Sequence, residues 1–180
     1  MASHIVPEGS FFDAAEAAGP GYLNFRLSPR WYEAVLEAAM LTDEVHSDPL
    51  SEEEAIRLLL DAAPGASMDP YLPLRRDRGN PLYRLRYALQ RLSRLPEPEN
   101  AVKLSAFSPA EQALIKSIAA SRSVEAEEFP RSAAHCLLSL ADTLQSCHAA
   151  SRLAGTSPDL RILTAARKTL ENGMNALGML

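Results

Sequence analysis

Helix-start signals recur along this chain of 180 residues, and they constrain its fold more than any other feature. Ser51 precedes Glu54 by three residues, and Ser108-Pro109 precedes Glu111 in the same way. In such a capping box, the serine and the glutamate each bond a backbone N–H that the first helical turn leaves without a partner. Ser28-Pro29 indicates another start, because proline fits the first position of a helix.

Apolar residues at helical spacing follow each start, and further prolines mark additional starts. The pattern predicts six helices, which begin near residues 29, 51, 81, 109, 130 and 158, with the last ending at Gly178. Tyr22–Leu27 alternates and is rich in aromatic and branched side chains, so it is predicted as one short strand. Residues 1–20 are expected to form a loop, 42–50 a linker and 64–79 an ordered loop. The sequence therefore predicts an all-α helical bundle with a short N-terminal strand or loop appendage.

The composition excludes several classes of protein. Hydrophobic residues make up 47% of the chain, which is enough to build a core. No stretch approaches the roughly 18 apolar residues that a membrane-spanning helix needs, and no secretory leader is recognisable. The two cysteines are too few for a disulfide framework. We therefore expect a cytoplasmic protein with no membrane partner.

The charges are unevenly distributed. The formal net charge is −5, yet residues 69–95 contain seven arginines and only two aspartates, a local net charge of +5. The rest of the chain then carries about −10. Such a bipolar molecule can present a cationic face to a phosphate backbone. The alternative is a basic surface that only contacts solvent. The seven arginines are Arg75, Arg76, Arg78, Arg84, Arg86, Arg91 and Arg94.

The segment 81–95 is predicted as a helix with two distinct faces. One carries four leucines at spacings of three and four, Leu82, Leu85, Leu89 and Leu92. The other carries Arg84, Tyr87, Arg91 and Arg94, about 200° away around the helix. Guanidinium groups suit phosphate oxygens, and an exposed tyrosine suits base stacking, so the second face favours RNA or DNA. Alternatively, Tyr87 is half-buried and the arginines pair with carboxylates elsewhere in the chain.

Six segments resemble arginyl-tRNA synthetases, in the order in which that family carries them, and one of these is Met68–Leu74, which is similar to the family's F-D-x-D-L segment. Gly19–Ser28 is similar to the G-P-G-[FY]-[IL]-N-F-x-L segment that ends the family's N-terminal additional domain. Glu54–Arg57 resembles the D-A-L-R signature of the anticodon-binding domain, and Asn80–Arg91 resembles N-P-V-Y-Y-V-Q-Y-A-H-A-R. His135–Ala141 is similar to H-Y-L-Y-E-L-A, and Arg167–Gly178 to R-x-x-L-x-N-G-L-x-L-L-G.

This resemblance implies a helical bundle of the class I synthetase (DALR) anticodon-binding type over residues 42–180. Residues 1–41 would be a remnant of the additional domain. The family's catalytic domain lies between these parts, but only about twenty residues separate Leu27 from Ser51. The family's His-x-Gly-His and Lys-Met-Ser-Lys motifs for ATP are also missing from the sequence. We therefore expect no enzyme activity and no catalytic residue.

The resemblance also implies which residues contact tRNA. Tyr22 and Asn24 match the aromatic residue and the asparagine that read a D-loop nucleotide of tRNA-Arg in bacterial synthetases of this type. The alternative is that Tyr22 packs inward while Asn24 bonds the backbone of a turn. The other candidates are expected near the anticodon stem and loop: Arg75, Arg76, Arg78, Tyr83, Arg84, Tyr87, Arg91, Arg94 and His148. His148 lies where the family has a Phe-Tyr pair in the penultimate helix.

No cofactor or metal is expected. The pairs His135-Cys136 and Cys147-His148 lie roughly 16 Å apart along one helix, too far for a single zinc ion. The expected partner is therefore tRNA, with tRNA-Arg favoured. A protein partner, such as a synthetase or another tRNA-using enzyme, is the alternative. The strand at residues 22–27 needs a pairing partner, which either the bundle or a homodimer would supply.

Overall fold

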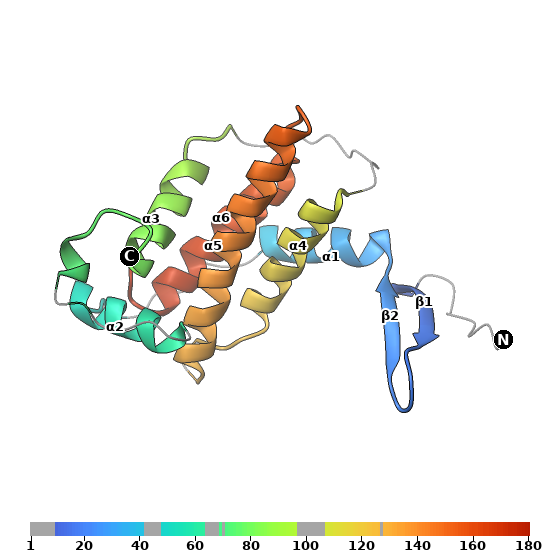
Figure 1. The fold of residues 1–180 in the computed structure, drawn as a ribbon, viewed down its shortest axis with the longest axis horizontal. Helices are drawn as coiled ribbons and strands as arrows, with labels where there is room; N and C mark the ends of the chain where they lie inside the picture. The colour runs from blue at the N-terminus through green and yellow to red at the C-terminus, as the bar shows by residue number, and fades with distance from the viewer. Residues whose placement is uncertain (1–9, 42–47, 64–68, 70, 97–106, 127) are drawn as a thin grey trace.

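The computed structural model describes residues 10–41, 48–63, 69, 71–96, 107–126 and 128–180. Within these ranges the chain is a helical bundle with a β-hairpin projecting from one end (Figure 1). The predicted all-α bundle with a short N-terminal appendage is therefore confirmed. The elements in chain order are β1 (Phe12–Ala17), β2 (Leu23–Leu27), α1 (Pro29–Met40), α2 (Glu52–Ala62), the 3₁₀ turn η1 (Leu72–Leu74), α3 (Pro81–Leu92), α4 (Pro109–Arg122), α5 (Pro130–Leu153) and α6 (Leu160–Ala176).

Helix α5 organises the bundle, because it contacts α2, α3, α4 and α6. Helix α6 also contacts α1, α3 and α4, so the described helices enclose one shared core. Most of the large side chains at its centre are leucines and isoleucines at the positions that helical periodicity selects. The largest fully buried ones are Ile56, Leu59, Leu82, Leu85, Leu92, Leu114, Ile115, Ile118, Leu137, Leu140, Ile162 and Leu170. Across the described ranges, no helix combines the length and the apolarity needed to cross a membrane.

Both predicted capping boxes form. The backbone N–H of Ser51 donates to the Glu54 carboxylate at 2.9 Å, and the N–H of Ser108 donates to the Glu111 carboxylate at 2.8 Å. Each serine hydroxyl accepts in return from the backbone N–H of its glutamate. The bonds from Ser51 lower the pKa of Glu54, which keeps the cap charged. Helix α5 also has the predicted bounds, from Pro130 to Leu153.

Two helix ends differ from the prediction. Helix α6 begins at Leu160 rather than at Pro158, because Asp159 is the N-cap and accepts from the Arg161 N–H at 2.8 Å. Helix α3 ends at Leu92 and not near residue 95, and the hydroxyl of Ser93 then bonds the last turn. Local side-chain bonds of this kind compete with further helical turns.

The strand predicted at residues 22–27 is β2, and it pairs antiparallel with β1. The loop predicted for residues 1–20 is therefore wrong over residues 12–17, while residues 1–9 lie outside the described ranges. Three alanines and a glutamate give β1 little strand propensity of its own, so its conformation depends on pairing with β2. One edge of β2 thus pairs with β1 of the same chain.

Helix α1 belongs to the bundle as much as to the hairpin. Its buried residues Tyr32, Leu36 and Ala39 share the core. Glu33 of α1 is bonded to Arg161 of α6 at 2.9 Å, which ties the two helices together at the surface. The division of the chain at residues 41 and 42 stays a prediction.

Candidate nucleic-acid interface

Asn80 fixes the start of α3 and the loop before it. Its side-chain oxygen accepts from the N–H groups of Leu82 and Tyr83 at 3.0 and 3.2 Å. Its amide nitrogen donates to the carbonyls of Leu72 and Arg75, both at 3.1 Å. Asn80 is buried, with only 4% of its surface exposed. One amide therefore sets the position of the 3₁₀ turn and of Arg75 relative to the arginines of α3.

The two predicted faces of α3 are present. Leu82, Leu85 and Leu92 are buried in the core, together with Ala88. The opposite face exposes 49% of Tyr87 and leaves Arg91 exposed, while Arg94 is exposed beyond the end of the helix. Arg84 is the exception on this face, because only 27% of its side chain is exposed.

Tyr83 and Tyr87 form a ridge on this face. Their ring centroids are 6.1 Å apart and their planes are 22° from parallel. Both rings line a groove of about 410 Å³ between α3 and α5, called here the α5 groove. Both also line a groove of about 580 Å³ beside the segment 74–80, called here the loop groove. The α5 groove contains Arg78, Arg84 and Arg91, and the loop groove contains Arg75, Arg76 and Arg86.

Three of the seven arginines in residues 69–95 pair with carboxylates of the same chain. Arg75 lies 2.8 Å from Asp69. Arg84 pairs with Asp142 of α5, and Arg86 pairs with Glu52 of α2. Of the predicted arginine face of α3, the alternative of an internal ion pair is confirmed for Arg84 alone among the described residues. The pairs are at least partly exposed, so each is worth roughly 0–1 kcal/mol of stability.

The other four arginines of this window are Arg76, Arg78, Arg91 and Arg94. None of them forms an ion pair with a described residue. Arg78 lies against the side-chain amide of Gln145, a neutral neighbour. The surface around the tyrosine ridge therefore keeps positive charge after its internal pairs are counted.

His148 lies in the α5 groove on the side of α5. Its Nε2 atom is buried and has no hydrogen-bond partner among the described residues. Burial lowers the pKa of His148, and the nearby charge of Arg91 lowers it further. The imidazole is therefore neutral at neutral pH, and its Nε2 atom stays buried without a partner in the described structure.

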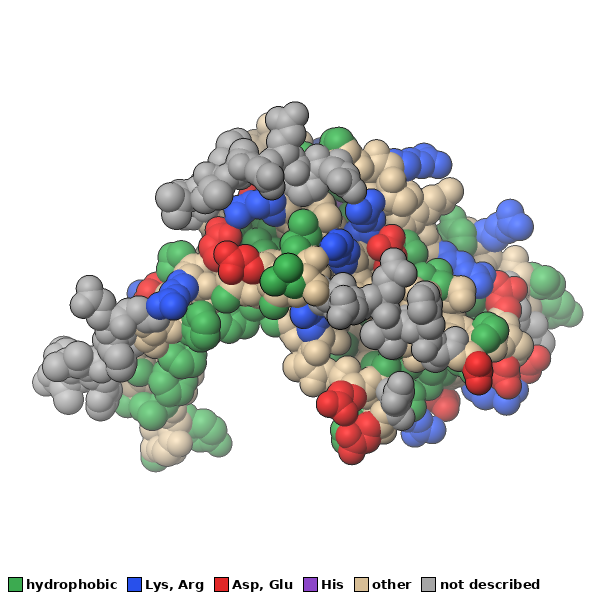
Figure 2. All heavy atoms as spheres, turned by 180° about the vertical axis from the view of Figure 1, so that it is seen from behind, with side chains coloured by type: hydrophobic (Ala, Val, Ile, Leu, Met, Phe, Trp, Pro, Cys, Tyr) green, Lys and Arg blue, Asp and Glu red, His purple; other side chains and the backbone are tan. Residues whose placement is uncertain are grey.

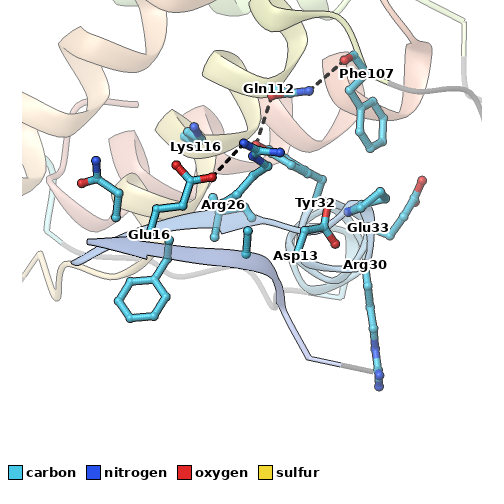
Figure 3. A pocket seen from close by; sticks show the side chains of 14 residues that line it. Asp13, Glu16, Arg26, Arg30, Tyr32, Glu33, Phe107, Gln112 and Lys116 are labelled. Atoms are coloured by element: carbon cyan, nitrogen blue, oxygen red, sulfur yellow. Dashed lines mark hydrogen bonds and ion pairs between the residues drawn. The ribbon is translucent and has the colours of Figure 1, made fainter. Parts of the chain in front are cut away.

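The hairpin candidates occupy a different site. Tyr22 is 73% exposed, so the alternative that it packs inward is wrong. Asn24 lines a cleft of about 980 Å³ between the hairpin and the bundle. Figure 3 shows Glu16 and Arg26 pointing from the hairpin toward the bundle within this cleft, joined by an ion pair of 3.3 Å. Across the cleft, the Tyr32 hydroxyl donates to the side-chain oxygen of Gln112 at 3.2 Å.

The structure does not bring all the predicted residues together. The hairpin with Tyr22 and Asn24 lies at one end of the molecule, and α3 lies at the other (Figure 1). The sequence missed Gln145 and Asp142, which form the α5 side of the groove. Their distance along the chain from α3 hid this contact, although a polar stripe on a long helix is a signal that can be searched for.

The cysteines do not have the properties of activated nucleophiles. Burial raises the pKa of Cys136. Burial also raises the pKa of Cys147, and the charge of Glu111 acts in the same direction. Both thiols are therefore protonated at neutral pH. In the described part of the chain, no three His, Cys, Asp or Glu side chains are placed to hold a metal ion.

Comparison with known proteins relates part of the chain to a tRNA ligase. The chain is 47% identical over 36 residues to the arginine–tRNA ligases of Desulfitobacterium hafniense strains DSM 10664 / DCB-2 and Y51. The match covers 20% of this chain and 6% of each relative. No family model matches the chain, and no solved structure matches it.

Fold and site together define an all-α bundle with an aromatic ridge flanked by arginine-lined grooves. The comparison adds that one region of the chain is related to arginyl-tRNA synthetase. The described residues contain the bundle and the hairpin and no catalytic-domain fold.

Proposed function

We propose that this protein binds tRNA without catalysing a reaction on it. The observation that carries the proposal is the Tyr83–Tyr87 ridge between two arginine-lined grooves. Aromatic rings stack on bases, and guanidinium groups bond phosphate oxygens. A ridge of rings between two rows of guanidinium groups suits a nucleic-acid strand that presents bases and phosphates together.

The charges support the same proposal. Arg91 lies on the exposed face of α3, and Arg94 is exposed just beyond the end of that helix; neither has a carboxylate partner among the described residues. Neighbouring cations repel each other, and bound phosphates would relieve that repulsion. The overall charge of −5 disfavours indiscriminate binding of polyanions, so contact would be confined to this surface.

The relation to arginine–tRNA ligase favours tRNA-Arg as the ligand. Tyr22 and Asn24 would contact the D-loop, and the α3 face would contact the anticodon arm. These sites lie at opposite ends of the bundle (Figure 1), so only a large folded ligand would reach both. The protein would then sequester tRNA-Arg in the cytoplasm or present it to another enzyme. Residues 42–180 would act as the anticodon-arm module, with residues 1–41 as the D-loop module.

A gel-shift titration with purified tRNA-Arg and a non-cognate tRNA at near-physiological salt tests this function. We expect tighter binding of tRNA-Arg, and we expect Asn24→Ala to reduce the preference more than the affinity. Absence of binding, or equal binding of both tRNAs by the unmodified protein, contradicts the proposal.

A protein-binding module is the second candidate function. The internal ion pairs of Arg75, Arg84 and Arg86 favour it, because they remove cations from the surface that RNA would need. A pull-down from nuclease-treated lysate separates the two functions. A synthetase or another tRNA-using enzyme retained after RNA has been destroyed supports the protein-binding module.

A further inference from the structure

The two faces of the β-hairpin differ sharply in polarity. Pairing sets Ala15 opposite Phe25 and Ala17 opposite Leu23 on one face. A register shift next to Phe12 puts its ring on that same face, 4.9 Å from the ring of Phe25. Because side chains alternate along a strand, Glu16, Asn24 and Arg26 belong to the other face, which lines the cleft.

The apolar face of the hairpin is exposed to solvent. Phe12, Leu23 and Phe25 are 39%, 55% and 53% exposed, respectively. Figure 2 shows hydrophobic side chains gathered on the hairpin, at the left of that view. An isolated two-stranded hairpin is at best marginally stable in water, and further strands would stabilise it. The hairpin is therefore an incomplete sheet.

Strand β2 has an open edge in the described structure, since its sheet contains two strands. The Tyr22 carbonyl accepts from the Ala18 N–H, and the Ser28 N–H donates to the Phe11 carbonyl. The even-numbered residues of β2 therefore direct their backbone N–H and C=O groups toward β1. In an antiparallel ladder, the alternate residues then direct their N–H and C=O groups to the free edge. These residues are Leu23, Phe25 and Leu27.

We propose that the free edge of β2 pairs antiparallel with β2 of a second copy of this chain, with Phe25 at the two-fold axis. The resulting sheet would have four strands, in the order β1, β2, partner β2, partner β1. The hydrophobic face would become continuous, with Phe25 opposite its own copy and Leu23 opposite the second copy of Leu27. Such an interface is isologous and closes at two subunits.

The regularity of the two strands favours β2 over β1 as the pairing edge. In the β2 register, Asn24 faces the second copy of Arg26, so no like charges are opposed. The irregularity at Asp13 disrupts the edge of β1.

A cleft lies beside β2, between the hairpin and the bundle. The cleft of about 980 Å³ is bordered by Asn24, Phe25, Arg26 and Leu27 of β2, with α4 opposite through Gln112 and Lys116. Side chains of a second β2 would share the cleft with these groups. The proposal does not depend on tRNA binding by the α3 face, because no residue of that face takes part, whereas Asn24, proposed above to contact the D-loop, lies in the pairing strand.

Cysteine cross-linking tests the register directly. Phe25→Cys is introduced into a chain that carries Cys136→Ser and Cys147→Ala, and the nuclease-treated protein is oxidised gently. Directly opposed, hydrogen-bonded residues have Cα atoms about 5.5 Å apart, within the range of a disulfide. We expect a covalent dimer joined through position 25. Leu153→Cys in the same background is the matched control, since Leu153 is 87% exposed on α5.

The mass in solution tests the interface without any cross-link. We expect the unmodified chain to sediment as a dimer, and Phe25→Lys to weaken association at least about ten-fold because two lysines would be opposed at the axis. Circular dichroism should show unchanged helix content, since Phe25 lies outside the bundle. A monomer at all concentrations, an unaffected Phe25→Lys dimer, or equal cross-linking through Leu153→Cys would each overturn the proposal.

Discussion

A terminal guanidinium nitrogen of Arg84 on α3 is bonded to both carboxylate oxygens of Asp142 on α5. The pair lies in the α5 groove, directly beside the tyrosine ridge. Asp142 is the acidic side chain that lines this groove, and 63% of it is exposed. The groove thus has an internal carboxylate in a place where a phosphate would otherwise bond Arg84.

Removal of this carboxylate should strengthen RNA binding. Asp142→Asn keeps the shape of the side chain and leaves Arg84 free to bond a phosphate. One additional phosphate contact at near-physiological salt corresponds to about five-fold tighter binding. Stability should change by less than about 1 kcal/mol, because the pair is partly exposed. Titration of labelled tRNA measures the effect, and Asp61→Asn is the control, since Asp61 pairs with Arg131 outside the grooves. Unchanged affinity would show that Arg84 has no role in binding.

Charge reversal at Arg91 should weaken binding and reduce its dependence on salt. Arg91 lines the α5 groove without a carboxylate partner in the described structure. Arg91→Glu should reduce the slope of log affinity against log salt by about one, and affinity should fall for all tRNAs alike. Arg131→Glu makes the same change in net charge at a side chain that is 74% exposed outside both grooves. Equal losses in both variants would mean that only net charge matters.

The tyrosine ridge should contribute through ring stacking rather than through its hydroxyl groups. Tyr87→Ala removes the half-exposed ring and should weaken tRNA binding by about 1–3 kcal/mol. Tyr87→Phe keeps the ring and should bind nearly as well as the original protein. Fluorescence anisotropy with a labelled anticodon stem-loop measures both variants. Weak binding by Tyr87→Phe would point instead to a hydrogen bond from the hydroxyl.

Asn80 should be important for stability because its side chain makes four hydrogen bonds in a buried position. Asn80→Ala removes a helix N-cap and leaves the carbonyls of Leu72 and Arg75 without these donors. The expected loss is about 2–3 kcal/mol in the free energy of unfolding. Denaturant titration followed by circular dichroism measures it. Ser93→Ala is the control, because the exposed Ser93 hydroxyl makes a single bond to the last turn of the same helix. A loss no greater than that of Ser93→Ala would contradict the bridging role.

His148 should make stability depend on pH. Burial, and then Arg91, hold its folded-state pKa below the ordinary value of 6.5. The unfolded chain therefore binds a proton more readily, and the free energy of unfolding falls as pH drops through 6.5 toward the folded-state pKa. The stabilisation that neutral His148 provides is fully present above pH 6.5, and the decline in the free energy of unfolding levels off below the folded-state pKa. Unfolding measured between about pH 7.5 and pH 5.5 should show this decline, and His148→Gln should flatten it. An identical decline in the variant would assign it to other groups.

The helices were predictable because their signals are local. Ser51 with Glu54, and Ser108 with Glu111, bond groups within one turn, so the sequence alone contains both partners. The alternation of leucine and arginine along α3 likewise fixes its buried and exposed faces. The exposed cationic face of α3 could therefore be predicted from the spacing of its residues.

The remaining features depend on contacts between distant residues. Arg84 and Arg86 find their carboxylates 58 and 34 positions away, and nothing local distinguishes them from Arg91. Strand β1 has an alanine-rich sequence that forms a strand only beside β2. Asn80 lies within a recognisable motif, but its bonds to Leu72 and Arg75 arise from the path of the loop. Tertiary context overrides local propensity in each case.

The bonds of Asn80 have a consequence for how such a surface changes over evolutionary time. The guanidinium groups come from two segments, an irregular loop and a helix, and one side chain holds both in alignment. Substitutions within the loop can therefore move or exchange Arg75, Arg76 and Arg78 while the leucines of the core are undisturbed. The loop arginines thus specify which ligand is bound, and the core leucines specify the fold. Ligand preference can therefore change while the fold is kept.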